Sequence, residues 1–151
     1  MARILVTGGA GYIGSHTAVE LMQQGYDVTI VDNLSNSNVD VLDGITAIVG
    51  RRPEFANIDC NDFVNLDSVF RQYPDIVGVI HFAASKAVGE SVQKPLLYYR
   101  NNIGSLITLL EVMKRHQVQN IVFSSSCTVY GQPDKAHLPV DETAPIQKAL
   151  S

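Results

Sequence analysis

Three serines stand together at residues 124–126, between the apolar run NIVF and the segment CTVYG. Three hydroxyls therefore gather where a buried strand would open into a loop, and loops carry a large share of catalytic and binding residues. A hydroxyl that acts on a substrate needs partner groups. The segment SSSCTVYG therefore predicts one half of an active site, and the other half has to be sought elsewhere in the sequence.

A glycine-rich turn near the N-terminus indicates a second kind of chemistry, the binding of phosphate groups. The segment VTGGAGYIGSH places Gly8, Gly9, Gly11 and Gly14 between a predicted strand and a predicted helix. Glycine has no Cβ, so the chain can turn tightly and phosphate oxygens can approach the backbone. The N-terminus of the helix adds free N–H groups and the positive end of the helix dipole. The order strand, glycine turn, helix and strand predicts a bound dinucleotide.

An acidic residue lies at the end of the second predicted strand, where a dinucleotide would place its adenine ribose. Asp32 lies 18 residues after Gly14 and 24 after Gly8. Its carboxylate can accept hydrogen bonds from the ribose hydroxyls, and it would repel a 2′-phosphate. Residues 32–38 contain no arginine or lysine that could bind such a phosphate. The pattern favours NAD over NADP; the alternative is an unrelated surface aspartate after a glycine-rich turn.

The elements that must position these residues alternate between short apolar runs and segments of helical period. Asn65 is the expected N-cap of the third helix. Alternation with helices predicts a parallel sheet covered on both faces, and right-handed crossovers make it doubly wound. The fold class is therefore α/β, a Rossmann-like doubly wound parallel sheet in one domain over residues 1–151. We expect strands at 3–8, 27–33, 55–59, 77–84 and 120–126, and helices at 12–25, 39–50, 65–73 and 95–117.

The longest predicted helix, residues 95–117, carries two rows of apolar side chains. One row at spacings of four and three residues is expected to face the core. A second row is a candidate contact with a partner subunit. The first row is Tyr99, Ile103, Leu106, Leu110 and Met113, and the second is Leu109 and Val112.

The composition excludes several classes of protein. The chain has 151 residues, 46% of them apolar and 17% charged, with a net charge of −4 and a pI near 5.4. The only adjacent basic pairs are Arg51–Arg52 and Lys114–Arg115, so neither nucleic acid nor an anionic membrane is an expected partner. Cys60 and Cys127 have no motif spacing, and we expect free thiols and no metal site. With no secretory leader pattern and no long apolar run, the expected location is the cytoplasm.

Five segments together resemble a known family: TGGAGYIGSH, DNLSNS, HFAASKAVGESVQKP, YYRNN and FSSSCTVYG. Their order and spacing resemble the extended short-chain dehydrogenase/reductase family, and within it the UDP-hexose 4-epimerases, over residues 2 to about 148. The resemblance implies an NAD-binding domain, a UDP-sugar substrate and an isomerase of carbohydrate metabolism. In that family, hydride passes from C4 of the sugar to NAD and returns to the opposite face.

The resemblance also implies roles for individual residues. The glycine turn would hold the pyrophosphate, and one serine after the fifth strand would bond the hydroxyl at C4 of the sugar. At position 60 the family usually has an aliphatic residue, so cysteine is a departure. The implied cofactor-binding residues are Gly8, Gly11, Tyr12, Ile13, Gly14, Asp32, Asn33, Asn36, Ser37, Asp59, Cys60, Phe82, Ala83, Ala84, Lys86 and Asn102, and the implied catalytic residue is Ser126.

The family's catalytic base and its helper, a tyrosine with a lysine four residues later, do not occur in the chain. The residues four positions after the six tyrosines are His, Ile, Val, Asn, Ile and Asp. We expect the pair, and the domain that binds the sugar nucleotide, to lie beyond Ser151, and we expect residues 1–151 alone to be inactive. A homodimer or a non-native oligomer through the 95–117 helix is also expected, because an uncovered apolar surface invites association.

Two other functions remain open from the sequence. Nucleotide-sugar 4,6-dehydratases, which are lyases on the same fold, carry Thr-Asp-Glu where this chain has Ser126, Cys127 and Thr128. A non-catalytic dinucleotide sensor would also lack the tyrosine and lysine. Simpler roles compete at single positions as well. His81 is interpreted as a packed residue at a strand end, and Lys86 could be an ordinary surface amine.

Overall fold

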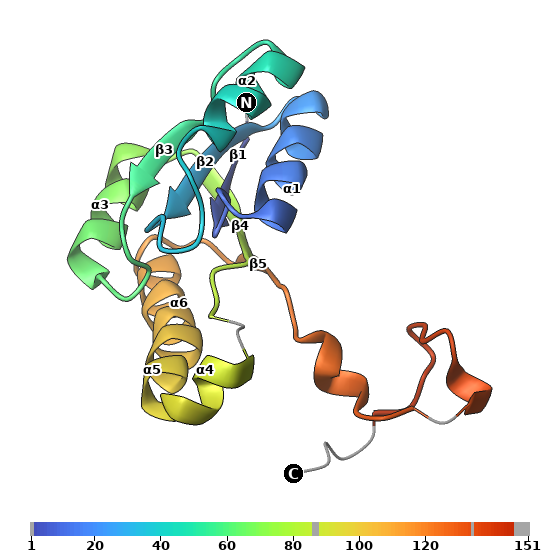
Figure 1. The fold of residues 1–151 in the computed structure, drawn as a ribbon. Helices are drawn as coiled ribbons and strands as arrows, with labels where there is room; N and C mark the ends of the chain where they lie inside the picture. The colour runs from blue at the N-terminus through green and yellow to red at the C-terminus, as the bar shows by residue number, and fades with distance from the viewer. Residues whose placement is uncertain (1, 86–87, 134, 147–151) are drawn as a thin grey trace.

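The computed structural model describes residues 2–85, 88–133 and 135–146. One parallel sheet of five strands forms the centre of the molecule, with the strand order β3-β2-β1-β4-β5 (Figure 1). The order reverses at β1, because the chain first adds strands on one side and then crosses to add β4 and β5 on the other. This confirms the predicted doubly wound sheet. The strands are β1 (Arg3–Thr7), β2 (Asp27–Asp32), β3 (Glu54–Asn57), β4 (Ile76–His81) and β5 (Asn120–Phe123).

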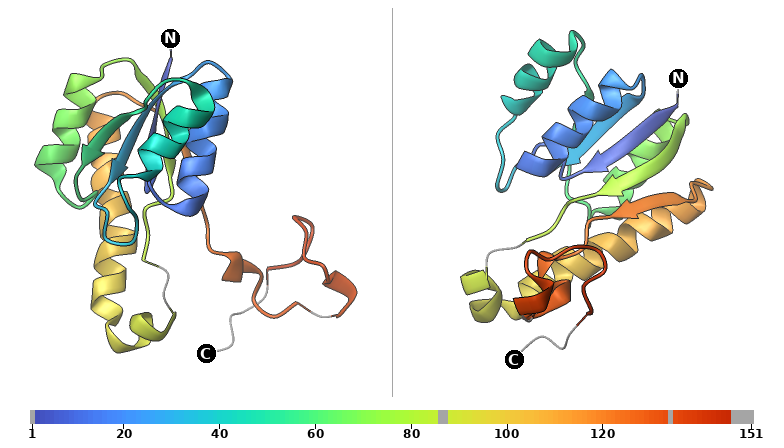
Figure 2. Two further views of the ribbon diagram at one scale, coloured as in Figure 1. Left: turned by 45° about the horizontal axis from the view of Figure 1, so that its top comes forward. Right: turned by 90° about the vertical axis from the view of Figure 1, so that its right-hand side faces the viewer.

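Helices cover both faces of the sheet (Figure 2). On one face α1 (Tyr12–Gln23) and α2 (Val41–Val49) pack over a core that contains Val6, and on the other face α3 (Phe63–Gln72) and α6 (Ser105–Arg115) pack over a core that contains Leu5. Both side chains are fully buried, and they alternate because successive residues of a strand point to opposite faces. This explains why the central strands β1, β2 and β4 consist mostly of apolar residues.

The predicted 95–117 helix is observed as three consecutive helical segments. They are α5 (Pro95–Tyr99), the π-helical segment η1 (Arg100–Gly104) and α6. A short helix that was not predicted, α4 (Val88–Gln93), precedes them. A π turn contains more residues than an α turn, so the side chains before and after it do not form one straight row.

The prediction of which row of this helix faces the core was wrong for most of its residues, although Met113 is buried as predicted. Leu109 and Val112, expected to contact a partner, are fully buried against the sheet. Tyr99, Ile103 and Leu110, expected in the core, are exposed. Apolar residues occur on more than half of the circumference of α6, so periodicity alone did not identify the side that meets the sheet.

The predicted cap of α3 was also wrong by three residues. The helix begins at Phe63, and the side chain of Asp62 accepts a hydrogen bond of 3.1 Å from the backbone N–H of Asn65. Asn65 is thus the donor in the cap and not the capping residue. This bond and the one from the Asn65 side chain lower the pKa of Asp62.

All five strands end earlier than predicted. The residues that were placed in strands but lie beyond them are Gly8, Asn33, 58–59, 82–84 and 124–126. Past β5, the chain leads away from the sheet through two short 3-10 helices, η2 (Cys127–Tyr130) and η3 (Lys135–His137) (Figure 1). None of the helices in the described part of the chain is long and apolar enough to cross a membrane.

A buried carboxylate joins α3 to α6. Asp67 accepts a hydrogen bond of 2.8 Å from His116 Nε2, forms an ion pair with Arg71 one turn along its own helix, and lies 3.5 Å from Arg115 Nε. The hydrogen bond from His116 and the two guanidinium groups hold the pKa of Asp67 below its usual value, although burial opposes this. The cluster therefore fixes the position of α6 on the sheet when Asp67 is ionised.

Replacing Asp67 with asparagine should lower the midpoint of thermal unfolding by several degrees at neutral pH, and by much less in strong acid. The ionised carboxylate stabilises the fold above its unfolded pKa of about 4, and this stabilisation is lost as the pH falls through the lowered pKa. Calorimetry over this pH range measures the effect. The control is Asp43→Asn, at an exposed ion pair with Arg52. Equal shifts for the two variants would contradict the assignment.

Candidate active site

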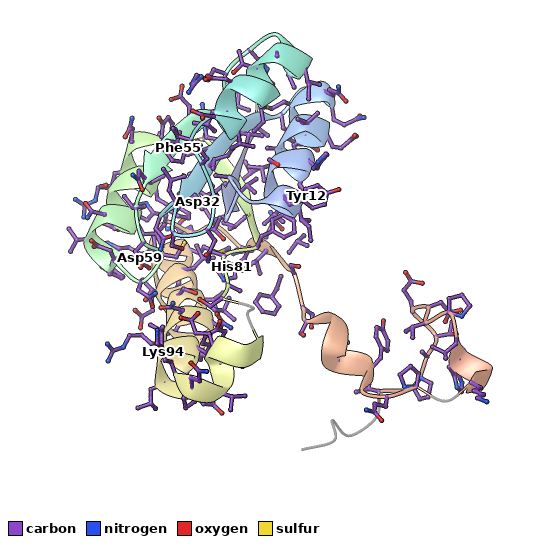
Figure 3. All side chains as sticks on the ribbon, in the orientation of Figure 1. Tyr12, Asp32, Phe55, Asp59, His81 and Lys94 are labelled. Carbon is purple, nitrogen blue, oxygen red and sulfur yellow. The ribbon has the colours of Figure 1, made fainter. Side chains whose placement is uncertain are left out.

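The candidate residues meet at one edge of the sheet. This site edge, as we call it, consists of the carboxyl ends of β1, β2 and β4 and the residues that follow them. Figure 3 shows Tyr12, Asp32, Asp59 and His81 around this edge. In open parallel sheets, ligands bind outside the carboxyl ends of the strands at the point where the strand order reverses. Here that point lies between β1 and β4.

The glycine turn is packed too tightly to contain side chains at two of its positions. A Cβ added to Gly14 would lie 2.3 Å from Gly8 O, and one added to Gly8 would lie 2.8 Å from Ala83 N. Gly8 also has a φ of +67°, in the left-handed region that favours glycine. The turn therefore packs closely against the start of α1 on one side and against the segment after β4 on the other.

The N-terminus of α1 presents backbone donors at the site edge. Gly11 is its N-cap residue and supplies no side-chain cap. The first N–H groups of a helix have no carbonyl one turn earlier to bond, so those of residues 12–14 are available to an anion. The side chain of Tyr12 is 81% exposed, and that of Ile13 is also exposed, so both point away from the core. This arrangement fits a pyrophosphate.

The carboxylate of Asp32 points toward the glycine turn. Its Oδ2 accepts a hydrogen bond of 3.0 Å from the backbone N–H of Ala10. Its Oδ1 accepts from the N–H of Leu34 at 2.9 Å and from the hydroxyl of Ser37 at 3.0 Å. Ser37, predicted to contact the adenosine, thus also orients Asp32. Asn36 is exposed beside it.

A polar group forms the neighbouring end of β3. Asp59 accepts hydrogen bonds from the Asn61 side chain at 2.9 Å and from the Asn33 side chain at 3.5 Å. Asn61 was not identified from the sequence, although it follows two predicted site residues. The side chain of Cys60 points the other way and is buried in the core below α3 and α6. Burial, with Asp59 and Asp32 nearby, raises the pKa of its thiol to about 12.

The segment after β4 is held by the π-helical segment. The side-chain oxygen of Asn102 accepts from Ser85 N at 2.8 Å, and its side-chain nitrogen donates to Ser85 O at 2.9 Å. Asn102 therefore places residues 82–85, which begin beside the glycine turn. Ser85 is a second residue that the sequence reasoning missed. Lys86 lies outside the described residues.

Residues 4–150 match the family described as the NAD dependent epimerase/dehydratase family. The chain belongs to this family. Among its relatives, the UDP-glucose 4-epimerase of Schizosaccharomyces pombe is 53% identical over 144 residues, which are 94% of this chain and 40% of the relative. The bifunctional protein GAL10 of Pachysolen tannophilus is 54% identical over 147 residues, which are 96% of this chain and 21% of the relative.

Solved structures of epimerases have the same fold as the chain. The UDP-glucose 4-epimerase of Stenotrophomonas maltophila, with bound NAD and formylated UDP-arabinopyranose, superposes with a TM-score of 0.88 at 48% identity, over 97% of this chain and 43% of that one. The enzyme of Bifidobacterium longum, in complex with NAD+ and UDP, gives 0.88 at 47% identity over the same shares. This chain thus spans about two fifths of these epimerases, at their N-terminal side.

Among the predicted site residues, Ser126 alone lies after β5. The ladder continues as far as Ser124, whose N–H donates to His81 O at 3.1 Å. After β5 the chain leads away from the sheet (Figure 1). Ser126 lies on this segment, and its side chain is exposed. Its contact with a sugar hydroxyl stays a prediction.

Proposed function

We propose that this chain is the NAD-binding part of a UDP-glucose 4-epimerase. The observation that carries the proposal is the glycine turn, where no Cβ fits between Gly14 and Gly8 and where the Asp32 carboxylate bonds the N–H of Ala10. Such a turn binds a pyrophosphate closely against the backbone. The support from relatives is that the epimerases of Stenotrophomonas maltophila and Bifidobacterium longum were crystallised with NAD.

In this proposal, different residues of the site edge bind different parts of the cofactor. The backbone N–H groups of Tyr12 and Ile13 bind the pyrophosphate. Asp32 keeps unused lone pairs on its carboxylate oxygens, and these accept the adenine ribose hydroxyls. Asn33 and Asp59 border the adenine. Residues 82–84, with Asn102, continue along the site edge toward the nicotinamide end, and Cys60 contributes its backbone while its thiol stays in the core.

The proposed reaction is the interconversion of UDP-glucose and UDP-galactose. The nicotinamide, when bound, supplies an acceptor for the hydride at C4 of the sugar. Ser126 orients the hydroxyl at that carbon. Because no tyrosine of the chain has a lysine four residues later, residues 1–151 by themselves should bind NAD without interconverting the sugars.

The epimerase proposal is preferred to a dehydratase, although the family includes both. Four curated relatives at 50–54% identity carry the name UDP-glucose 4-epimerase or, in one case, the name of a bifunctional protein. The tripeptide at 126–128 also lacks the acid pair of the dehydratases. We further propose that the enzyme acts in galactose metabolism in the cytoplasm, in keeping with the buried free thiol of Cys60.

The substitution Asp32→Arg should weaken NAD binding about tenfold or more and shift the preference toward NADP. The carboxylate repels a 2′-phosphate, whereas a guanidinium binds one. Calorimetric titration of the chain with each dinucleotide measures both affinities. The matched control is Asp40→Arg, which makes the same change of charge at an exposed position before α2. An unchanged preference in Asp32→Arg, or the same shift in the control, would overturn the assigned role.

We also propose that the chain forms a homodimer through α5, η1 and α6. Exposed apolar side chains occur in all three segments: Tyr99, at 63% exposure, in α5, Ile103, at 49%, in η1, and Ile107 and Leu110 in α6. Together they form an apolar surface that a second copy of the chain would cover.

The double substitution Ile103→Glu and Leu110→Glu should convert the dimer to a monomer, because like charges would then face each other across an apolar contact. Light scattering coupled to size-exclusion chromatography gives the mass. Ile48→Glu, at an apolar residue 63% exposed on α2, is the control and should leave the mass unchanged. A wild-type chain that is monomeric at high concentration would refute this interface.

A further inference from the structure

Two buried polar side chains connect the strand ends below the site edge. Thr7 is the last residue of β1 and His81 the last residue of β4, and they are paired in register across the sheet. Thr7 is fully buried and His81 is 2% exposed. Thr7 Oγ1 and His81 Nδ1 are 2.6 Å apart. The chain continues from Thr7 directly into the glycine turn and from His81 directly into residues 82–85.

The same threonine contacts the segment after β4 through its backbone and its hydroxyl. The N–H of Phe82 donates to Thr7 O at 3.0 Å, and the N–H of Ala83 donates to Thr7 Oγ1 at 3.4 Å. Gly8, the next residue, approaches Ala83 so closely that a Cβ would lie 2.8 Å from Ala83 N. The orientation of the Thr7 hydroxyl therefore affects how closely residues 82–85 meet the glycine turn.

The Thr7 hydroxyl lies between the Ala83 amide and the His81 ring. A hydroxyl has one proton and two lone pairs. Its oxygen accepts from the Ala83 N–H and is hydrogen-bonded to His81 Nδ1, with a direction that depends on the tautomer of the ring. Burial lowers the pKa of His81 to about 4, so its imidazole is neutral at neutral pH. A neutral ring can bond the hydroxyl through Nδ1 as either donor or acceptor.

We propose that His81 is a positioning residue of the cofactor site: its Nδ1 fixes the Thr7 hydroxyl, which holds Ala83 and the following residues against the glycine turn. This proposal rests on the proposed function, because the geometry that it preserves is that of the NAD site. The other ring nitrogen, Nε2, is buried without a hydrogen-bond partner among the described residues. A phenyl ring of similar shape would avoid that unpaired atom, so the bond at Nδ1 is what the imidazole specifically contributes.

Two matched pairs of variants test the proposal. Thr7→Val and His81→Phe remove the hydrogen bond and keep the approximate shape. Thr7→Ser keeps the hydroxyl, and His81→Asn keeps a polar atom near the position of Nδ1 while it removes Nε2. Calorimetric titration with NAD, below the unfolding temperature of every variant, gives the affinities. Hydrogen exchange at the Ala83 amide gives a second readout that needs no ligand.

We expect Thr7→Val and His81→Phe each to weaken NAD binding about tenfold and to speed hydrogen exchange at the Ala83 amide. The affinities of Thr7→Ser and His81→Asn for NAD should stay within about threefold of that of the wild type. The double variant Thr7→Val/His81→Phe should be no worse than Thr7→Val alone, because His81 acts on the segment only through the Thr7 hydroxyl. If all four variants lose thermal stability but keep wild-type affinity and Ala83 exchange, the residues only stabilise the core and the inference is wrong.

The outcomes also separate this inference from the proposed function. A wild-type chain that fails to bind NAD overturns the proposed function, and Ala83 exchange still decides whether His81 positions the segment. If the wild-type chain and His81→Phe bind NAD equally tightly, the proposed function is retained and the inference is overturned. If His81→Phe does not fold, the Thr7→Val and Thr7→Ser pair decides the matter.

Discussion

The tight packing of the glycine turn against its neighbours determines the rest of the site. Gly14 and Gly8 meet so closely that a single Cβ would overlap a backbone oxygen, and Gly8 meets the backbone of Ala83 in the same way. These contacts place the start of α1, the end of β1 and the segment after β4 within one small volume. A side chain in place of either glycine would push these elements apart, together with the groups that are proposed to hold the cofactor.

Polar side chains then fix what the glycines bring together. Asp32 bonds the turn from β2, Asn102 bonds the segment after β4 from the π-helical segment, and Thr7 with His81 joins the strand ends below. Each of these residues connects two different elements. The site edge is thus held by a few hydrogen bonds between elements that are themselves held by the two apolar cores.

Much of the fold could be predicted because its patterns are local. The glycine turn, the acid at the end of β2 and the alternation of apolar runs with helices each follow from neighbouring residues, and the sheet that they predict is observed. The side of α6 that faces the core could not be predicted, since apolar residues surround much of that helix and only the sheet selects among them. The π turn and the cap at Asp62 depend likewise on geometry that several residue types can satisfy.

The most direct test of the central claim is an NMR titration of the chain with NAD, in which each backbone amide is followed separately. We expect the largest changes in chemical shift at the amides of Gly11, Tyr12 and Ile13, with further changes at Asp32 and Ala83 and none at the far ends of the strands. Unchanged chemical shifts of the amides at the start of α1, with or without binding elsewhere, would contradict the claim that this turn binds the cofactor.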